Sequence, residues 1–260
     1  MVTVKSEHEI QLMREAGLIL AEVHMRLGEE IKAGMTTKQV DRLCEKLIRS
    51  HNCEPSFLGY EGYPASVCVS INDEVVHGIP SDDRIIMEGD IVSLDTGVIW
   101  KGWQSDAART HAIGKVSDEA LKLIEVTRQS FFEGIKAAIP GNHINDIGRA
   151  IENYVKPYKF GIVEDLVGHG IGREMHEEPE VPNFYTKRKG IKLQKGMTLA
   201  VEPMINAGTW EVAWTEDDDW TVYTRDGSLS AHYENTIAIT DGEPEVLSLL
   251  PEEKKLYNVK

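Results

Sequence analysis

The segment GDIVSLDTGVIW, residues 89–100, places one carboxylate, Asp95, inside a run of apolar residues. A second segment, GMTLAVEPMI at residues 196–205, does the same with Glu202. Short apolar runs that follow a glycine and are rich in β-branched residues are typical of buried strands. A buried carboxylate without a partner is costly, so each must be neutralised, paired with a base or bound to a cation. The two segments therefore predict strands that carry a functional site.

These two segments occupy equivalent positions of an internal repeat. At a constant offset of 107 residues, Asp95 aligns with Glu202 and Gly89 with Gly196. The same offset aligns Gly34 with Gly141, Val40 with Ile147, Arg42 with Arg149 and Glu45 with Glu152. In addition, Asp106 and Glu234 each precede a glycine by eight residues, Gly114 and Gly242. The repeat predicts a pseudo-twofold fold in which equivalent polar residues meet at the centre.

Helix signals alternate with strand signals along the chain. We expect helices that start after Ser6, after Thr36, after Ser117 and at Asn142 or Asn145, and strands near residues 66–71, 90–94, 197–201 and 233–239. The fold class is thus α/β (α+β), with helices and antiparallel strands. No Pro- or Ser-rich linker divides the chain, so we expect one catalytic domain over 1–260, with halves at about 1–115 and 116–251. Two domains divided at about residue 115 are the alternative.

Composition excludes some classes of function. The chain has 28 Lys and Arg against 43 Asp and Glu, a net charge of -15, which argues against binding nucleic acid or anionic membranes through the whole surface. Its three cysteines show no metal-binding spacing, which favours a reducing compartment. No segment reaches the roughly 18 apolar residues of a membrane span, and the start lacks an apolar signal core. We expect a cytoplasmic protein.

Further acidic and imidazole groups complete a candidate metal cluster. Asp106 alone suits a surface turn and Glu234 alone a solvated strand, but their parallel placement after Asp95 and Glu202 favours a shared site. His169 lies between glycines, which suits a tight backbone path around an imidazole better than a regular core strand. Four carboxylates and one imidazole suit two divalent ions.

Two other histidines flank this cluster in the sequence. His176 begins His-Glu-Glu-Pro, which fails as an H-E-x-x-H zinc motif because residue 180 is Glu and Pro179 would break the helix. His176 and His77 are therefore free to hydrogen-bond a scissile carbonyl or amide, unless they are ordinary loop histidines.

At these residues the chain resembles the type I methionine aminopeptidases, from the first helix to about Pro251. The likeness is carried by residues 58–68 (LGYEGYPASVC), 72–80 (NDEVVHGIP), 168–179 (GHGIGREMHEEP) and 228–236 (SLSAHYENT). The resemblance implies the pita-bread fold and a central pair of metal ions. Their ligands would be Asp95, Asp106, His169, Glu202 and Glu234.

The resemblance also implies a role for each site residue. Asp106 and Glu234 would bridge the ions, Asp95 would chelate one, and His169 with Glu202 would hold the other. A bridging water or hydroxide would attack the carbonyl of the first residue, with Glu202 as general base. His176 would stabilise the oxyanion, His77 would contact the scissile amide, and the free amino terminus would bind one ion.

A methionine pocket follows from the same resemblance. The matching positions are Phe57, Tyr60, Tyr63, Cys68, Met175 and Trp220, although any one of them could be core packing. Phe57 and Met175 depart from the residues expected in the family. The donor set admits Co, Mn, Fe(II) or Zn.

The expected substrates are nascent polypeptides that start with methionine and have a small second residue. We expect a monomer that contacts the ribosome transiently and no membrane; the acidic segment 215–219 argues against docking on ribosomal RNA through that loop. One alternative is a proline-specific aminopeptidase or prolidase of the same fold, which would lack the motif Tyr-x-Gly-Tyr-Pro found at residues 60–64. Another is a catalytically inactive binding protein, in which metal ligands would be lost.

Overall fold

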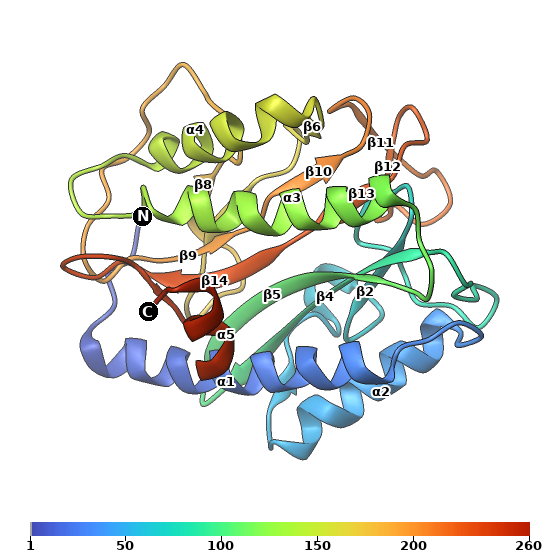
Figure 1. Ribbon diagram of the computed structural model, residues 1–260. Coiled ribbons are helices and arrows are strands. Elements are labelled where there is room, and N and C mark those ends of the chain that lie inside the picture. Colours follow the sequence, from blue (N-terminus) through green and yellow to red (C-terminus); the bar gives the residue numbers. More distant parts are fainter. Residues whose placement is uncertain (1) are drawn as a thin grey trace.

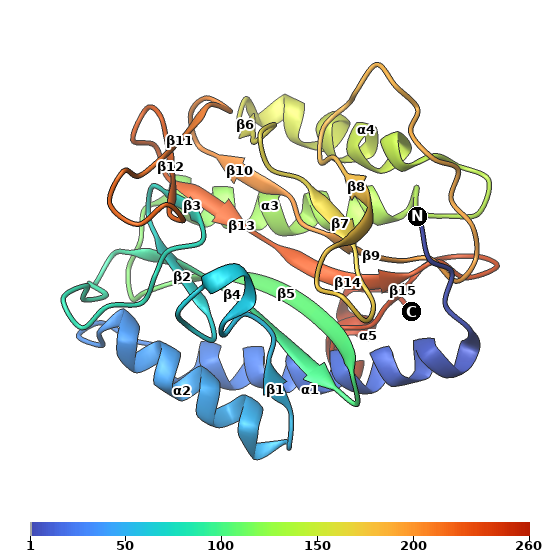
Figure 2. The ribbon, with the colours of Figure 1, turned by 180° about the vertical axis from the view of Figure 1, so that it is seen from behind.

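The computed structural model describes residues 2–260 and has a layer of helices against one face of a sheet (Figure 1). The helices are α1 (Glu7–Glu30), α2 (Thr37–Ser50), α3 (Asp118–Ile135), α4 (Ile144–Val155) and α5 (Pro251–Tyr257), with 3-10 turns η1 (Tyr60–Gly62) and η2 (Lys156–Tyr158). Seen from behind in Figure 2, the strands lie in front of α1 to α4. One face of the sheet is thus covered by helices and the other by strands and loops.

Nine strands form the main sheet. They are β1 (Glu54–Pro55), β2 (Cys68–Ile71), β4 (Ile91–Trp100), β5 (Trp103–Ala112), β7 (Gly168–Gly170), β8 (Glu177–Val181), β9 (Thr198–Val201), β14 (Glu234–Ala238) and β15 (Glu245–Val246). Their order is β1-β4-β5-β14-β9-β7-β8, with β2 beside β4 and β15 beside β14. All pairings are antiparallel, as predicted.

Six short strands form two smaller sheets beside the main one. The first has the order β13 (Ser230–His232), β10 (Met204–Asn206), β6 (Gly161–Ile162), and the second has the order β11 (Val212–Trp214), β12 (Val222–Thr224), β3 (Glu74–Val76). The second sheet joins strands from distant parts of the chain, because β12 pairs with β3 through Val222 and Val76. It brings the segment around residue 220 next to the segment that follows β3.

Three helices begin where the sequence predicts, because side chains there cap the free amide groups of the first turn. At α1 the Ser6 hydroxyl accepts from the Glu9 N–H, and the Glu9 carboxylate accepts from the Ser6 N–H at 2.8 Å. Thr36 and Gln39 repeat this capping box at α2. Ser117 caps α3 by accepting from the N–H of Ala120.

The start of α4 differs from the prediction, because neither Asn142 nor Asn145 is its capping residue. His143 occupies that position, and its N–H donates to the Asp146 carboxylate at 2.8 Å. Asn145 is buried inside the first turn, where its side chain accepts from the Thr186 N–H and donates to the Thr186 carbonyl, both at 2.7 Å. This tertiary partner cannot be read from local sequence.

Strand alternation separates the helix-facing core from the functional face. In β4, Leu94 lies in the core formed with α1 and α2, so its neighbour Asp95 points to the opposite face. In β14, Ile237 lies in the core formed with α3 and α4, so Glu234 also points away from the helices. Ala108 of β5 lies between them and pairs with both Asp95 and Glu234. The equivalent strands of the repeat therefore meet at the middle of the sheet.

The three cysteines are unpaired. Cys44, Cys53 and Cys68 are all buried and form no disulfide. Burial raises the pKa of Cys53 to about 11 and that of Cys44 to about 12, so both thiols stay protonated at neutral pH. Within residues 2–260, no helix combines the length and apolarity needed to cross a membrane.

Candidate functional site

Five polar side chains converge on the face of the sheet that lacks helices. Asp106 of β5, His169 of β7 and Glu234 of β14 are buried and offer ligand atoms within 4.8 Å of one another. Glu202 follows β9, and its Oε1 lies 3.7 Å from His169 Nε2. Asp95 of β4 is adjacent, because β4 and β5 form one hairpin. All five predicted metal ligands thus lie together.

The carboxyl groups of this cluster have raised pKa values. Burial, reinforced by the neighbouring acids, raises the pKa of Asp95, Glu202 and Glu234 well above the usual range. Burial also raises the pKa of Asp106 to about 7. Among the described residues, Asp95 Oδ1 and Glu234 Oε1 are buried without a hydrogen-bond partner. Buried oxygens that lack donors are what a cation would satisfy, so the residues fit divalent metal.

His169 is oriented as a metal-binding imidazole. Its Nδ1 donates to the carbonyl oxygen of Gly170 at 2.8 Å, which leaves Nε2 unprotonated toward the carboxylates. Burial lowers the pKa of His169 to about 3, so the ring is neutral. The flanking glycines are required by space: a Cβ at Gly168 would lie 2.4 Å from the carbonyl oxygen of Ala200, and one at Gly170 would lie 2.3 Å from that of Glu178.

The cluster forms the floor of a cleft with a volume of about 160 Å³. All of the residues predicted for the site line this cleft: Asp95, Asp106, His169, Glu202, Glu234, His77, His176, Phe57, Tyr60, Tyr63, Cys68, Met175 and Trp220. The exposed Glu61 also lines it and was not among the predicted site residues. The carboxylates, the imidazoles and the apolar groups therefore share one cavity.

One wall of the cleft is aromatic and apolar. The Tyr63 ring makes edge contacts with Phe57, at 6.5 Å between centroids, and with Trp220, at 5.1 Å. Cys68 is buried in the same apolar cluster as Tyr63. Met175 is buried and packs with the partly buried Phe57 and Tyr60. Such a wall suits an unbranched apolar side chain, including a thioether.

Two further imidazoles flank the carboxylates. His77 follows β3, and its ring lies 6.1 Å from that of Trp220. His176 lies 4.2 Å from the His169 ring, and its Nδ1 is 2.8 Å from the Tyr60 hydroxyl. Burial lowers the pKa of His77 to about 4 and also lowers that of His176. Both rings are therefore neutral at pH 7 and can each donate one hydrogen bond.

Sequence reasoning missed His232. This residue is fully buried two positions before Glu234, and its Nε2 lies 3.6 Å from Glu202 Oε2. Burial lowers the pKa of His232 to about 3, so it faces Glu202 as a neutral group. Its place in the segment 228–236 was the only available signal, because the repeat offers no counterpart with an imidazole.

The chain is similar to known proteins over nearly its full length. The sequence model of metallopeptidase family M24 matches residues 11–241. The chain is 54% identical to a methionine aminopeptidase of Clostridium acetobutylicum, over 96% of this chain and 99% of the relative. It is 44% identical to methionine aminopeptidase 1 of Bacillus subtilis, over 95% of this chain and 99% of the relative.

Solved structures agree with the sequence relatives. A methionine aminopeptidase from Rickettsia prowazekii matches with a TM-score of 0.93 and 40% identity, over 96% of this chain and 100% of the other. The predicted pita-bread fold is thereby confirmed. A prolidase from Pyrococcus horikoshii matches with a TM-score of 0.74 at 23% identity, over 94% of this chain but 63% of the other, and shares the fold alone.

Proposed function

Because the chain belongs to metallopeptidase family M24, we propose that it removes the amino-terminal methionine from new polypeptides and that the cleft described above is its active site. The chain is a hydrolase of the methionine aminopeptidase type, as its similarity to several enzymes of that name over 94–96% of its length requires. One observation carries the assignment of the cleft: four buried carboxylates and a neutral imidazole share a cavity with a wall suited to a thioether.

The cluster would hold two divalent ions. Asp106 and Glu234, at the centre of the sheet, would be shared by both; Asp95 would hold one, and His169 with Glu202 the other. Hard oxygen donors with one imidazole admit Mn, Fe(II), Co or Zn. When bound, these ions supply Lewis acidity and lower the pKa of a water molecule.

The residues of the chain supply the proton transfers and the hydrogen bonds. Glu202, whose pKa is raised by burial, would accept the proton that the attacking water gives up. The Tyr60 hydroxyl lies 2.8 Å from His176 Nδ1; with the hydroxyl as the donor, the proton of His176 would lie on Nε2, from which it would stabilise the developing oxyanion. His77, which lines the same cleft, would donate to the scissile amide.

Substrate selection follows from the shape and charge of the cleft. The methionine side chain would pack against Phe57, Tyr63 and Trp220, while the cationic amino terminus would face the carboxylates. A cleft that fixes the free amino terminus hydrolyses only the first peptide bond. We propose that the second residue of the substrate is small.

We further propose that the protein is monomeric and cytoplasmic, with one catalytic domain over 1–260 built from halves at about 1–115 and 116–251. It would meet its substrates as nascent chains, in transient association with the ribosome. The net charge of -15 limits that association to local surfaces.

A proline-specific peptidase is not favoured. The chain is 22–24% identical to prolidases and an X-Pro aminopeptidase, so these likenesses concern the fold alone. An inactive binding protein is not favoured either, because the two sequence relatives described above are methionine aminopeptidases by name.

The deciding experiment follows free amino acids released from Met-Ala-Ser and from Ala-Pro-Ala. The purified protein is stripped with a chelator and resupplied with Mn or Co. Metal-dependent release of methionine alone supports the proposal. Release from the proline peptide would move the chain to the prolidase branch, and release from neither would favour a binding protein.

A further inference from the structure

We propose that Arg84, paired with the buried Glu74, is a positioning residue that holds the backbone of His77 so that its imidazole reaches the cleft. The inference rests on the proposed function only for the catalytic consequence, because it uses the role assigned to His77. The positioning itself is a statement about the backbone and can be tested without turnover.

The backbone of His77 adopts an unfavourable conformation. Its φ is +61°, in the left-handed region, which a residue with a Cβ adopts only at a cost in free energy. Residues of this kind persist where the surrounding structure over-determines them, often at active sites. β3 ends at Val76, so the strand itself cannot hold His77.

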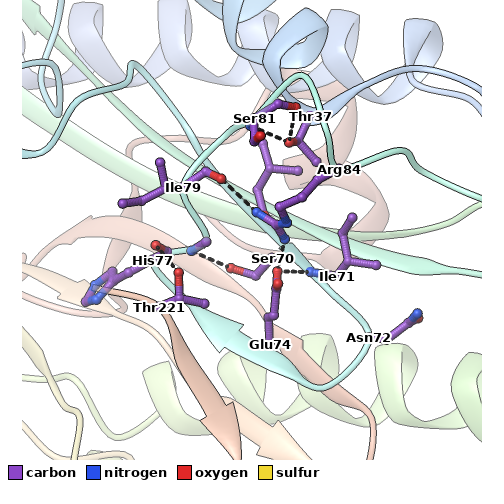
Figure 3. A network of polar contacts seen from close by, with 12 residues as sticks. Thr37, Ser70, Ile71, Asn72, Glu74, His77, Ile79, Ser81, Arg84 and Thr221 are labelled. Carbon is purple, nitrogen blue, oxygen red and sulfur yellow. Dashed lines mark hydrogen bonds and ion pairs between the residues drawn. The ribbon is translucent and has the colours of Figure 1, made fainter. Parts of the chain in front are cut away.

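The segment that follows β3 is held by side chains along its whole length (Figure 3). Each carbonyl oxygen of residues 77–79 accepts a hydrogen bond from a side chain. The donors are Thr221 Oγ1 to His77 at 3.5 Å, the Tyr63 hydroxyl to Gly78 at 3.1 Å and Arg84 Nη1 to Ile79 at 2.8 Å. In Figure 3 the His77 ring points away from Arg84. The ring lines the cleft while its backbone is fixed.

Arg84 joins three segments of the chain, through two backbone carbonyls and one side-chain carboxylate. Its Nη1 donates to the Ile79 carbonyl, after His77, and its Nη2 donates to the Val69 carbonyl of β2 at 3.3 Å. The same Nη2 pairs with the Glu74 carboxylate in β3, and Glu74 also accepts from the Ile71 N–H at 2.8 Å. One guanidinium fork thus fixes the spacing between β2, β3 and the segment after His77.

The segment after β3 packs tightly against β2. A Cβ at Gly78 would lie 2.3 Å from the Val69 carbonyl oxygen, so the backbone already touches β2. Glu74 is only 7% exposed, and burial raises the pKa of its carboxyl while Arg84 opposes that shift. Buried ion pairs stabilise little in net terms, because desolvation offsets the attraction. The position of this ion pair is therefore better explained by its effect on the backbone geometry of this segment than by a gain in the stability of the fold.

A second ion pair in the same chain provides a matched control. Arg14 of α1 pairs with Glu245 of β15 through Nε at 2.6 Å and Nη2 at 2.7 Å, with side chains 29% and 18% exposed. Arg84 has a similar side-chain exposure of 27%. Neither Arg14 nor Glu245 lines the cleft, so a change there tests the loss of an Arg–Glu pair without a path to His77.

The first test is a double-mutant cycle on turnover of Met-Ala-Ser. Arg84→Lys keeps the charge opposite Glu74 but cannot bridge both carbonyl oxygens and the Glu74 carboxylate, so kcat should fall roughly tenfold, since small misplacements of a catalytic group cost up to about 10²-fold. Metal content should stay unchanged, because no ligand is altered. In the His77→Ala background, Arg84→Lys should have no further effect, whereas Arg14→Lys should change kcat in neither background.

The second test needs no activity. The backbone ¹³C chemical shifts of His77 and Gly78, measured by NMR on the full chain, report the left-handed conformation directly. They should move in Arg84→Lys and in the isosteric Glu74→Gln, and stay in place in Arg14→Lys. Unchanged shifts in a folded Arg84→Lys protein would overturn the inference, whatever happens to kcat.

Failure of the proposed function gives a different pattern. An inactive wild-type protein, or a His77→Ala variant with full activity, would remove the catalytic role of His77. The chemical shifts would still decide whether Arg84 positions that residue. Equal losses of kcat from Arg84→Lys in both backgrounds would show that Arg84 acts on the cleft by another route and would also count against the inference.

Discussion

The two halves of the repeat build their share of the metal cluster in different ways. In the first half, Asp95 and Asp106 lie on one hairpin, in which β4 and β5 pair in register from Ile91 opposite Ala112 to Trp100 opposite Trp103. In the second half, Glu202 and Glu234 flank a long excursion that contains β10 to β13. The first half joins its two carboxylates by a direct hairpin, whereas the second half has additional strands inserted between them.

That excursion supplies what the symmetric part lacks. It carries Trp220, and Asp218 holds this segment by accepting from the N–H of Trp220 at 2.9 Å and from the N–H of Thr221 at 2.8 Å. Through the pairing of β12 with β3 it also meets His77. The comparison indicates that the equivalent strands supply the clustered carboxylates, whereas the excursion adds Trp220 and the strand that pairs beside His77.

The largest effect should come from breaking the symmetric part. Asp95→Asn removes a charge and a chelating oxygen, so metal content should fall and kcat should drop by more than about 100-fold, because even residues that only hydrogen-bond to metal ligands are worth roughly 10–100-fold. Metal analysis and turnover of Met-Ala-Ser measure both. Glu54→Gln, an exposed carboxylate on the neighbouring β1, is the control. Full metal content with normal turnover would defeat the assignment.

A change at His176, which has no counterpart in the other half of the repeat, should separate catalysis from metal binding. His176→Ala removes the proposed oxyanion donor, so kcat should fall about 10²- to 10³-fold while metal content stays normal. The exposed His8 provides a control substitution, His8→Ala, that should change neither quantity. If His176→Ala lost as much metal as Asp95→Asn, ligands and catalytic groups would have been sorted wrongly.

The same division explains how far the sequence could be interpreted without a structure. Helix starts at Ser6, Thr36 and Ser117 were predictable because capping depends on residues three apart, and the strands around Asp95 and Glu202 were predictable from their short apolar runs. The four carboxylates of the candidate metal cluster followed from the repeat, and His169 followed from its flanking glycines. These signals are local or periodic, so they can be recognised without knowledge of tertiary contacts.

The substrate side of the cleft left no such signal. Trp220 contacts Tyr63 and His77 because β12 pairs with β3, a strand far away in the sequence. Residue spacing does not encode that pairing. The pocket and the roles of both outer histidines came from family resemblance, and His232 was missed. The start of α4 was misplaced for the same physical reason, a distant partner at Thr186.

A smaller effect should follow from altering the excursion. Trp220→Ala removes one face of the apolar wall, so kcat/KM for Met-Ala-Ser should fall roughly tenfold, in the range expected when a hydrophobic pocket loses part of its contact. Metal content should not change. Trp214→Ala is a matched control, because Trp214 lies in the same excursion with its side chain 49% exposed. Similar losses from both changes would mean that Trp220 acts through folding of the excursion and not through the pocket.

The smallest effect should come from Tyr60→Phe, which keeps the ring and removes the hydroxyl that faces His176 Nδ1. Without that donor, the His176 ring can also adopt the tautomer with its proton on Nδ1. In the molecules with this tautomer, Nε2 cannot donate a hydrogen bond to the oxyanion. Losing one hydrogen bond should lower kcat roughly 2- to 10-fold with KM and metal content unchanged. The loss should disappear in the His176→Ala background, whereas Tyr185→Phe, at an exposed tyrosine, should be neutral in both. If the loss persisted in the His176→Ala background, the Tyr60 hydroxyl would act on the substrate directly. Tyr60 would then contribute by contact with the methionine and not by orienting the His176 imidazole.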